Sequence, residues 1–196
     1  MEFIEVNGVG LRYELSGKGD RTVLVHEMGG SLESWDDVVP WFAESRRVLR
    51  YDTRGAGMSE KVRGELGIDT MAEDIAALLD NLGIAGKVAL AGIAVGGAIA
   101  LHFAARYPER TSAVAVGSPA TGIAPDRRAA ALERIAKVEA AGMAFAVEDS
   151  MRNGYARSSA PTPSVLSDTG RDGSATIPRA MRRSIECWQA RICRTN

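Results

Sequence analysis

The 196-residue chain lacks the features typical of metalloproteins, membrane proteins and nucleic-acid binders. Its only cysteines, Cys187 and Cys193, have no partner histidine, so we expect no metal site. The formal net charge of −1 gives no reason to expect binding to nucleic acid or to a membrane surface. No apolar run approaches the ~18 residues that a bilayer-spanning helix needs. The start, MEFIEVNGVG, has no basic segment followed by an apolar one, so we expect no secretory signal and a cytoplasmic location.

Strand and helix patterns alternate through the first 156 residues. Apolar and polar side chains alternate on either side of Asn7-Gly8, which predicts a hairpin of residues 2–6 and 11–15. Four further apolar runs predict strands, at 22–27, 46–52, 87–93 and 112–120. Helical spacing follows each of these strands, at 31–45, 69–83, 95–108 and 127–155. The order predicts an α/β fold with a mostly parallel sheet and helices on both faces.

Several residues are expected to mark the ends of these elements. The predicted N-cap of the helix at 31–45 is Ser31, and that of the helix at 69–83 is Asp69 or Thr70. Gly83 is expected to end the second of these helices. Asp52 is expected to end its strand in a structural role. Active sites of such sheets lie at the carboxyl ends of the strands, so the residues that follow strands are the candidates for function.

A tight corner, GIAVG, joins the strand at 87–93 to the helix at 95–108. Gly92 and Gly96 are small enough to relieve the crowding that arises where a strand turns sharply into a helix. The tip of the corner is Ala94, and the N–H of Val95 lies at the helix N-terminus, where it can stabilise an oxyanion. Taken alone, the pattern also fits a tight strand–helix turn of a nucleotide-binding sheet.

Three stretches together resemble the α/β-hydrolase fold enzymes, and most closely those similar to 3-oxoadipate enol-lactonase. They are LVHEMGGSLESW (24–35), RVLRYDTRGAGMSE (47–60) and LAGIAVGGAIALHFAARYPER (90–110). The resemblance covers about residues 1–156. It implies a nucleophile elbow at Ala94 and a second oxyanion N–H from Met28 or Glu27. It also implies hydrolysis of a small ester or lactone, without metal or cofactor; the oligomeric state does not follow from it.

The chain departs from the family pattern at the elbow itself. The family usually has serine at the tip, but Ala94 has no nucleophilic atom, and Glu27 stands where glycine is common. The family's triad runs nucleophile, acid, histidine along the chain, yet the only histidines are His26 and His102. We therefore expect the chain as written to be inactive. The alternative is a catalytically silent protein that binds a small ligand.

The remaining candidate residues have two interpretations each. His26, in the same loop as Gly29, either holds that loop by hydrogen bonds or acts in catalysis. Glu27 is either a solvated charge or a carboxylate that faces the pocket and orients a water. Arg54 either fixes its own loop or contacts an anionic substrate. His102 is either a packed helix residue or a base.

The composition changes near residue 157. Residues 157–196 contain seven arginines against three acids and are rich in Ser, Pro and Gly. A freely chosen back-translation of residues 157–193, read one base out of register, gives an amphipathic sequence rich in helix formers and aromatics. We expect a hydrolase core over 1–120, the start of a helical cap over 121–156, and an aberrant tail over 157–196. That tail would be frameshifted or disordered, which truncates the fold after the start of the cap.

Overall fold

The computed structural model describes residues 1–64, 66–142 and 145 of the chain. It separates two compact units, the first covering Met1–Thr121 and the second beginning at Gly122. In the second unit the described structure is helix α4 (Pro125–Ala141), which confirms the helical prediction as far as residue 141. Residues 143–144 and 146–156 of the predicted cap and the predicted tail at 157–196 lie outside the described residues.

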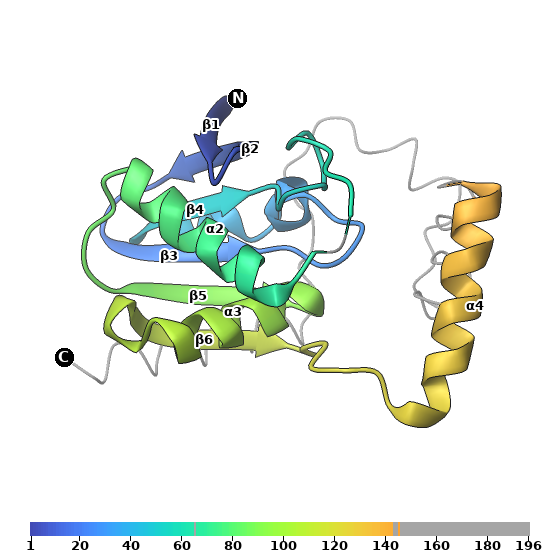
Figure 1. Ribbon diagram of the computed structural model, residues 1–196. Coiled ribbons are helices and arrows are strands. Elements are labelled where there is room, and N and C mark those ends of the chain that lie inside the picture. The colour runs from blue at the N-terminus through green and yellow to red at the C-terminus, as the bar shows by residue number, and fades with distance from the viewer. Residues whose placement is uncertain (65, 143–144, 146–196) are drawn as a thin grey trace, which may run out of the picture. The chain divides into compact units, whose positions relative to one another are not determined.

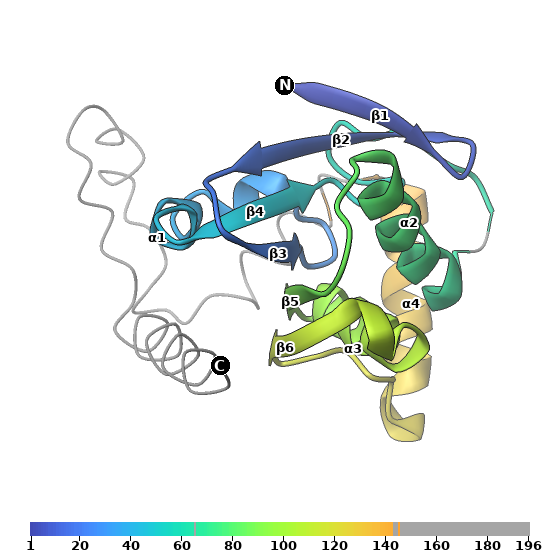
Figure 2. The same cartoon turned by 90° about the vertical axis from the view of Figure 1, so that its left-hand side faces the viewer.

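The first unit is built on a sheet whose strand order, within the described residues, is β1-β2-β4-β3-β5-β6 (Figures 1 and 2). The strands are β1 (Glu2–Val6), β2 (Val9–Ser16), β3 (Asp20–Val25), β4 (Arg46–Tyr51), β5 (Val88–Ile93) and β6 (Thr111–Gly117). β2 pairs antiparallel with both β1 and β4, whereas β4, β3, β5 and β6 pair in parallel. Asn7 and Gly8 both have positive φ, as a two-residue hairpin turn requires. The predicted mostly parallel sheet is confirmed.

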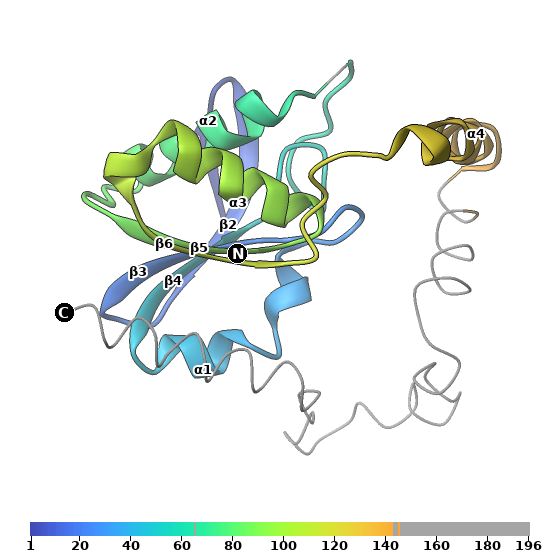
Figure 3. The ribbon, with the colours of Figure 1, turned by 90° about the horizontal axis from the view of Figure 1, so that it is seen from below.

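Helices cover both faces of this sheet (Figure 3). α2 (Ile68–Asn81) and α3 (Val95–Arg106) lie on one face, and the 3₁₀ turn η1 (Leu32–Trp35) and α1 (Val39–Ala43) lie on the other. A second 3₁₀ turn, η2 (Pro108–Arg110), connects α3 to β6. Two separate apolar clusters fill the layers between sheet and helices.

Burial of the central strands on both faces explains their nearly continuous apolar sequences. In β3, Val23 and Val25 belong to the cluster under α2 and α3, while Leu24 belongs to the cluster with Trp35 and Phe42. All three β3 residues have 0% exposed surface. Alternate side chains of one strand therefore hold the two helical layers to the same sheet.

The predicted helix at 31–45 is interrupted. Ser31 is the N-cap of η1, but α1 starts afresh at Val39. Pro40 has no N–H to donate to the carbonyl of Asp36, so a continuous α-helix cannot form across this stretch. The predicted apolar face survives the break, because Trp35, Val38, Val39 and Phe42 all lie in one cluster.

Helix α2 begins earlier than predicted, with Gly67 as its N-cap instead of Asp69 or Thr70. The carboxylate of Asp69 bonds side chains of α3 and not its own helix N-terminus. The predicted stop at Gly83 is confirmed: its φ is +62°, and the N–H of Ile84 donates to the carbonyl of Leu79 at 2.8 Å.

Candidate active site

The carboxyl ends of β3, β4 and β5 lie at one edge of the sheet, because these strands are parallel. Val25 pairs with Gly92, so the loop after β3 and the corner after β5 leave the sheet side by side. Leu24 pairs with Arg50, which brings the loop after β4 to the same edge. These three loops are the stretches that carry the resemblance described above.

Ala94 occupies a strained conformation between β5 and α3. Its φ of +51° and ψ of −117° lie outside the regions that alanine normally adopts. Its N–H donates to the carbonyl of Gly117 at 3.0 Å, and its own carbonyl accepts from Ala98 at 3.2 Å and Ala120 at 2.9 Å. The backbone of the tip is therefore fixed by the end of β6 and by the first turn of α3.

Two glycines beside the tip are required by close backbone packing. A Cβ atom at Gly96 would overlap the carbonyl oxygens of Val25 and His26. A Cβ atom at Gly92 would overlap the backbone of Gly96. The G-x-A-x-G spacing thus permits a corner that packs directly on the end of β3.

The Val95 N–H and the loop after β3 are the candidate oxyanion donors. Val95 is the first residue of α3, so its N–H has no intrahelical acceptor. The loop after β3 makes a turn in which the N–H of Gly30 donates to the carbonyl of Glu27 at 3.1 Å. Gly29 supplies the positive φ, +79°, at the third position of this turn, and Met28 beside it is exposed.

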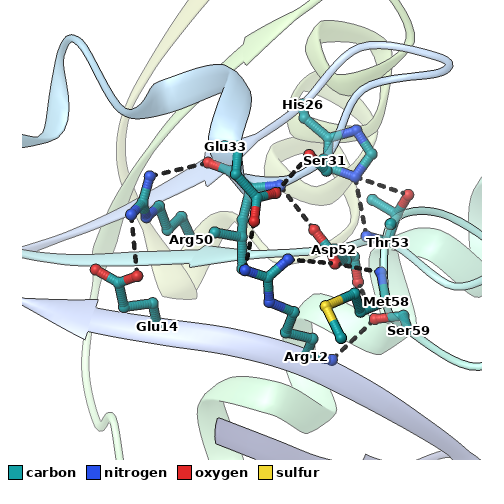
Figure 4. Close-up of polar contacts among 12 residues, drawn as sticks. Arg12, Glu14, His26, Ser31, Glu33, Arg50, Asp52, Thr53, Met58 and Ser59 are labelled. Carbon is teal, nitrogen blue, oxygen red and sulfur yellow. Dashed lines mark hydrogen bonds and ion pairs between the residues drawn. The ribbon is translucent and has the colours of Figure 1, made fainter. Parts of the chain in front are cut away.

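His26 is buried and uses both ring nitrogens within the loops of this edge (Figure 4). Nε2 accepts the N–H of Thr53 at 3.0 Å, which requires an unprotonated Nε2. Nδ1 then carries the proton and donates it to the carbonyl of Glu27 at 2.7 Å. This arrangement ties the loop after β3 to the loop after β4.

Glu27 is half-buried and turns its carboxylate back over its own loop. Oε1 accepts a hydrogen bond from Ser34 Oγ at 2.9 Å. A Cβ atom at Gly30 would lie only 2.7 Å from Cδ of Glu27 and 2.7 Å from Ser34 Oγ. Glycine at position 30 is what allows the carboxylate to occupy this place.

Asp52 joins its own loop to two segments that are distant in the sequence (Figure 4). Its side chain is fully buried, and Oδ1 accepts the N–H of Leu32 at 2.7 Å. Oδ2 accepts the N–H of Met58 at 2.7 Å and is paired with Arg12 of β2 at 3.4 Å. A Cβ atom at Gly57 would overlap this carboxylate, so the glycine-rich loop after β4 folds around it.

Arg12 also holds Glu33, in an ion pair on the outer side of the same network (Figure 4). The hydrogen bond from Arg12 lowers the pKa of Glu33 to about 2, with a further contribution from the hydroxyl of Ser31 at 2.6 Å. The same pairing raises the pKa of Arg12. Both groups are therefore charged at neutral pH.

Arg54 points to α2, where its guanidinium bonds both carboxylate oxygens of Asp74. The side chain of Asp74 is 1% exposed, and its Oδ1 also accepts from Asn7 Nδ2 at 2.9 Å. The hydrogen bonds to Asp74 raise the pKa of Arg54. The pair fixes the loop after β4 to helix α2.

The other histidine lies away from the elbow tip. His102 is on α3, and its Nε2 lies 2.8 Å from Oδ1 of Asp69 on α2, a carboxylate that Arg106 also contacts. Ser118, after β6, has a positive φ of +44°.

Cys187 and Cys193 lie outside the described residues. Within the described ranges there is no group of three or more His, Cys, Asp or Glu side chains placed to hold a metal ion.

The structure brings Ala94, Val95 and the loop from His26 to Gly30 together at one edge, and it directs Arg54 to α2. From the sequence, Asp52 is expected only to end its strand, and the bonding roles of Thr53 and Gly30 do not follow from the sequence pattern. A signal for Asp52 is present in the glycine-rich loop that follows it, since a buried carboxylate needs backbone N–H donors nearby.

The chain belongs to the α/β hydrolase fold family, whose family model matches residues 23–173. The match begins within β3 and includes β4, β5, β6, the elbow and helix α4. Helices among the described residues include none that is both long and apolar enough to cross a bilayer.

Two curated relatives show how the similarity is distributed. The chain is 41% identical over 114 residues to a dihydrolipoyllysine-residue acetyltransferase component of the acetoin cleaving system from Pseudomonas putida, a match of 57% of this chain and 30% of the relative. It is 35% identical over 117 residues to 3-oxoadipate enol-lactonase 2 from Acinetobacter baylyi, a match of 59% and 43% respectively. The chain thus aligns with less than half the length of each.

Solved structures agree with this assignment. The enol-lactonase from Burkholderia xenovorans LB400 superposes with a TM-score of 0.70 at 31% identity, covering 76% of this chain and 57% of that one. A thermophilic esterase from Thermogutta terrifontis superposes with a TM-score of 0.71 at 25% identity, covering 78% and 58%. The resemblance to enol-lactonase-like hydrolases that the sequence indicated is confirmed at the level of the family.

Proposed function

We propose that this chain carries the elbow and the oxyanion loop of a hydrolase that acts on small esters or lactones, and that it is inactive as written. The observation that carries the proposal is the strained tip at Ala94, directly before the Val95 N–H and packed on the end of β3. Relatives named as an enol-lactonase and an esterase support the substrate class. No metal or cofactor enters this chemistry.

The geometry assigns a role to each part of the site. A carbonyl group placed above position 94 would direct its oxygen toward the N–H of Val95, with Met28 or Glu27 supplying a second backbone donor. A serine hydroxyl at the tip would attack the carbonyl carbon and form an acyl-enzyme, while the C–O bond of the ester or lactone breaks and its alcohol oxygen takes up the proton that the hydroxyl loses. The methyl group of Ala94 cannot, so the ligand would be held and not cleaved.

A silent ligand-binding role is the second candidate, and one observation favours it. The conformation of Ala94 costs on the order of 1–3 kcal/mol, and it persists although the tip has no nucleophilic atom. Strain of this kind is retained where the surrounding backbone geometry has a use, and here that use would be oxyanion binding.

The substitution Ala94→Ser tests the proposal. The unmodified chain and the variant are incubated at mildly alkaline pH with p-nitrophenyl acetate, an activated ester. The acetyl group passes to the hydroxyl, p-nitrophenolate leaves, and hydroxide from the solution takes the hydroxyl proton. We expect the Ala94→Ser chain to acquire one acetyl group at position 94, detected by peptide mass spectrometry. We expect the unmodified chain to acquire none there.

The matched control is Ala105→Ser, which adds the same hydroxyl at an exposed position of the same helix. Acetylation of this variant should stay at the background level. Equal acetylation of the two variants would show that position 94 has no special reactivity, and would overturn the proposal.

A further inference from the structure

Glu27 places a negative charge in the loop beside the elbow. Within the part of the chain that the structure describes, this carboxylate makes no ion pair; the partner of Oε1 is the neutral hydroxyl of Ser34 at 2.9 Å. The side chain is half-buried and lies over Gly30, where a Cβ atom would come within 2.7 Å of its Cδ. The charge is therefore fixed in place by the loop itself.

Glu27 is close to the tip of the elbow because its peptide unit packs on α3. The carbonyl oxygen of His26 belongs to the peptide that joins His26 to Glu27. That oxygen is one of the two atoms that a Cβ at Gly96 would overlap. Gly96 is two residues from Ala94, so a ligand bound at Ala94 and Val95 lies beside the main chain of Glu27, whose carboxylate stays within the same loop at Ser34 and Gly30.

The arginines near this edge do not compensate the charge of Glu27. Arg12, Arg50 and Arg54 have side chains that are 12%, 10% and 10% exposed, and each pairs with at least one other carboxylate. Lys61 and Arg63, on the loop after β4, are exposed, and solvent and salt screen their charges. Within the described part of the chain, the carboxylate of Glu27 is therefore not compensated by a bonded cation.

We propose that Glu27 makes this site selective for neutral or cationic esters and lactones over those that carry a carboxylate. A ligand carboxylate beside Glu27 would meet a like charge in a partly desolvated place, where repulsion is stronger than in water. A ligand ammonium group would be attracted there. The inference rests on the proposed function, because it assumes that the ligand binds at Ala94 and Val95.

Binding of three lactones to the 196-residue chain, measured by titration calorimetry at about pH 6, tests this selectivity. The ligands share one ring and differ in charge: γ-butyrolactone is neutral, homoserine lactone carries an ammonium group, and 5-oxotetrahydrofuran-2-carboxylate is an anion. Glu27→Gln removes the charge with little change of shape. Glu5→Gln is the matched control, since Glu5 is an exposed residue of β1, which is separated from β5 by three strands of the sheet.

We expect the unmodified chain to bind the neutral and cationic lactones more tightly than the anion. Glu27→Gln should strengthen binding of the anion and weaken binding of the cation, each roughly five-fold, and Glu5→Gln should change neither. Binding with an unchanged preference in Glu27→Gln would overturn this inference alone. Absence of binding by all three lactones would overturn the ligand-holding role proposed for the site, and this inference with it. Acetylation at position 94 tests the elbow separately.

Discussion

Gly96 lies so close to the carbonyl oxygen of Val25 that no side chain can be placed at position 96 without moving one of the two backbones. We expect Gly96→Ala to lower the free energy of unfolding by about 3 kcal/mol, because backbone atoms cannot move aside as a side chain can. Gly117→Ala is the control, since its Cβ would make an ordinary contact at 3.8 Å with Ile93. Urea unfolding of both variants measures the difference; equal stabilities would contradict the close packing.

The buried pair of Arg54 and Asp74 should be important for stability. The side chain of Arg54 is 10% exposed, and Asp74→Asn removes the carboxylate that pairs with it. We expect the free energy of unfolding to fall by about 3 kcal/mol. Asp80→Asn, on the same helix, breaks an ion pair whose carboxylate is 65% exposed and should cost less than about 1 kcal/mol. Similar losses in the two variants, measured by chemical denaturation, would show that burial of the pair has no effect.

The ring proton of His26 should be on Nδ1 and not on Nε2, because Nε2 accepts the N–H of Thr53. A long-range ¹H–¹⁵N spectrum at neutral pH should show an unprotonated Nε2 and a protonated Nδ1. His26→Ala should lower the free energy of unfolding by about 2 kcal/mol, because the N–H of Thr53 loses its acceptor in a buried place. A protonated Nε2 would contradict the hydrogen bond that joins the two loops.

Glu33 should give a small, pH-dependent contribution to stability. Arg12 lowers its pKa to about 2, so the folded state favours the ionised form. That contribution is complete above the ordinary glutamate pKa and is lost as the pH falls toward 2. The side chain is 46% exposed, so Glu33→Gln should cost less than about 1 kcal/mol at pH 7. Comparing the unfolding midpoints of the two proteins at neutral and acidic pH checks this. A difference that grows on acidification would contradict the pairing.

The strands and the elbow could be predicted from the sequence because their signals are local. The buried runs around Leu24 and Leu90 have few polar residues, and Gly92 and Gly96 flank the tip at the spacing that a tight corner needs. The break before Val39 does not follow from the spacing of the apolar residues, although Pro40 provides a local signal for it.

The contacts of Asp52 could not be predicted in the same way. Its partners, Arg12, Leu32 and Met58, are separated from it by 40, 20 and 6 positions. Only the strand order β2-β4-β3 brings them around one carboxylate. A single sequence shows neither that order nor the packing that buries the charge.

The contact between the elbow and the end of β3 is made by main-chain atoms, and this has a consequence for how the site can change during evolution. Side chains at positions 27 and 94 can be exchanged while the distance between the loop and the corner stays the same. Alanine at the tip, where the family resemblance implies serine, is then a change of side chain on an unchanged backbone. New chemistry or new ligand preference could arise in this chain by one or two substitutions, with no need to rebuild the fold.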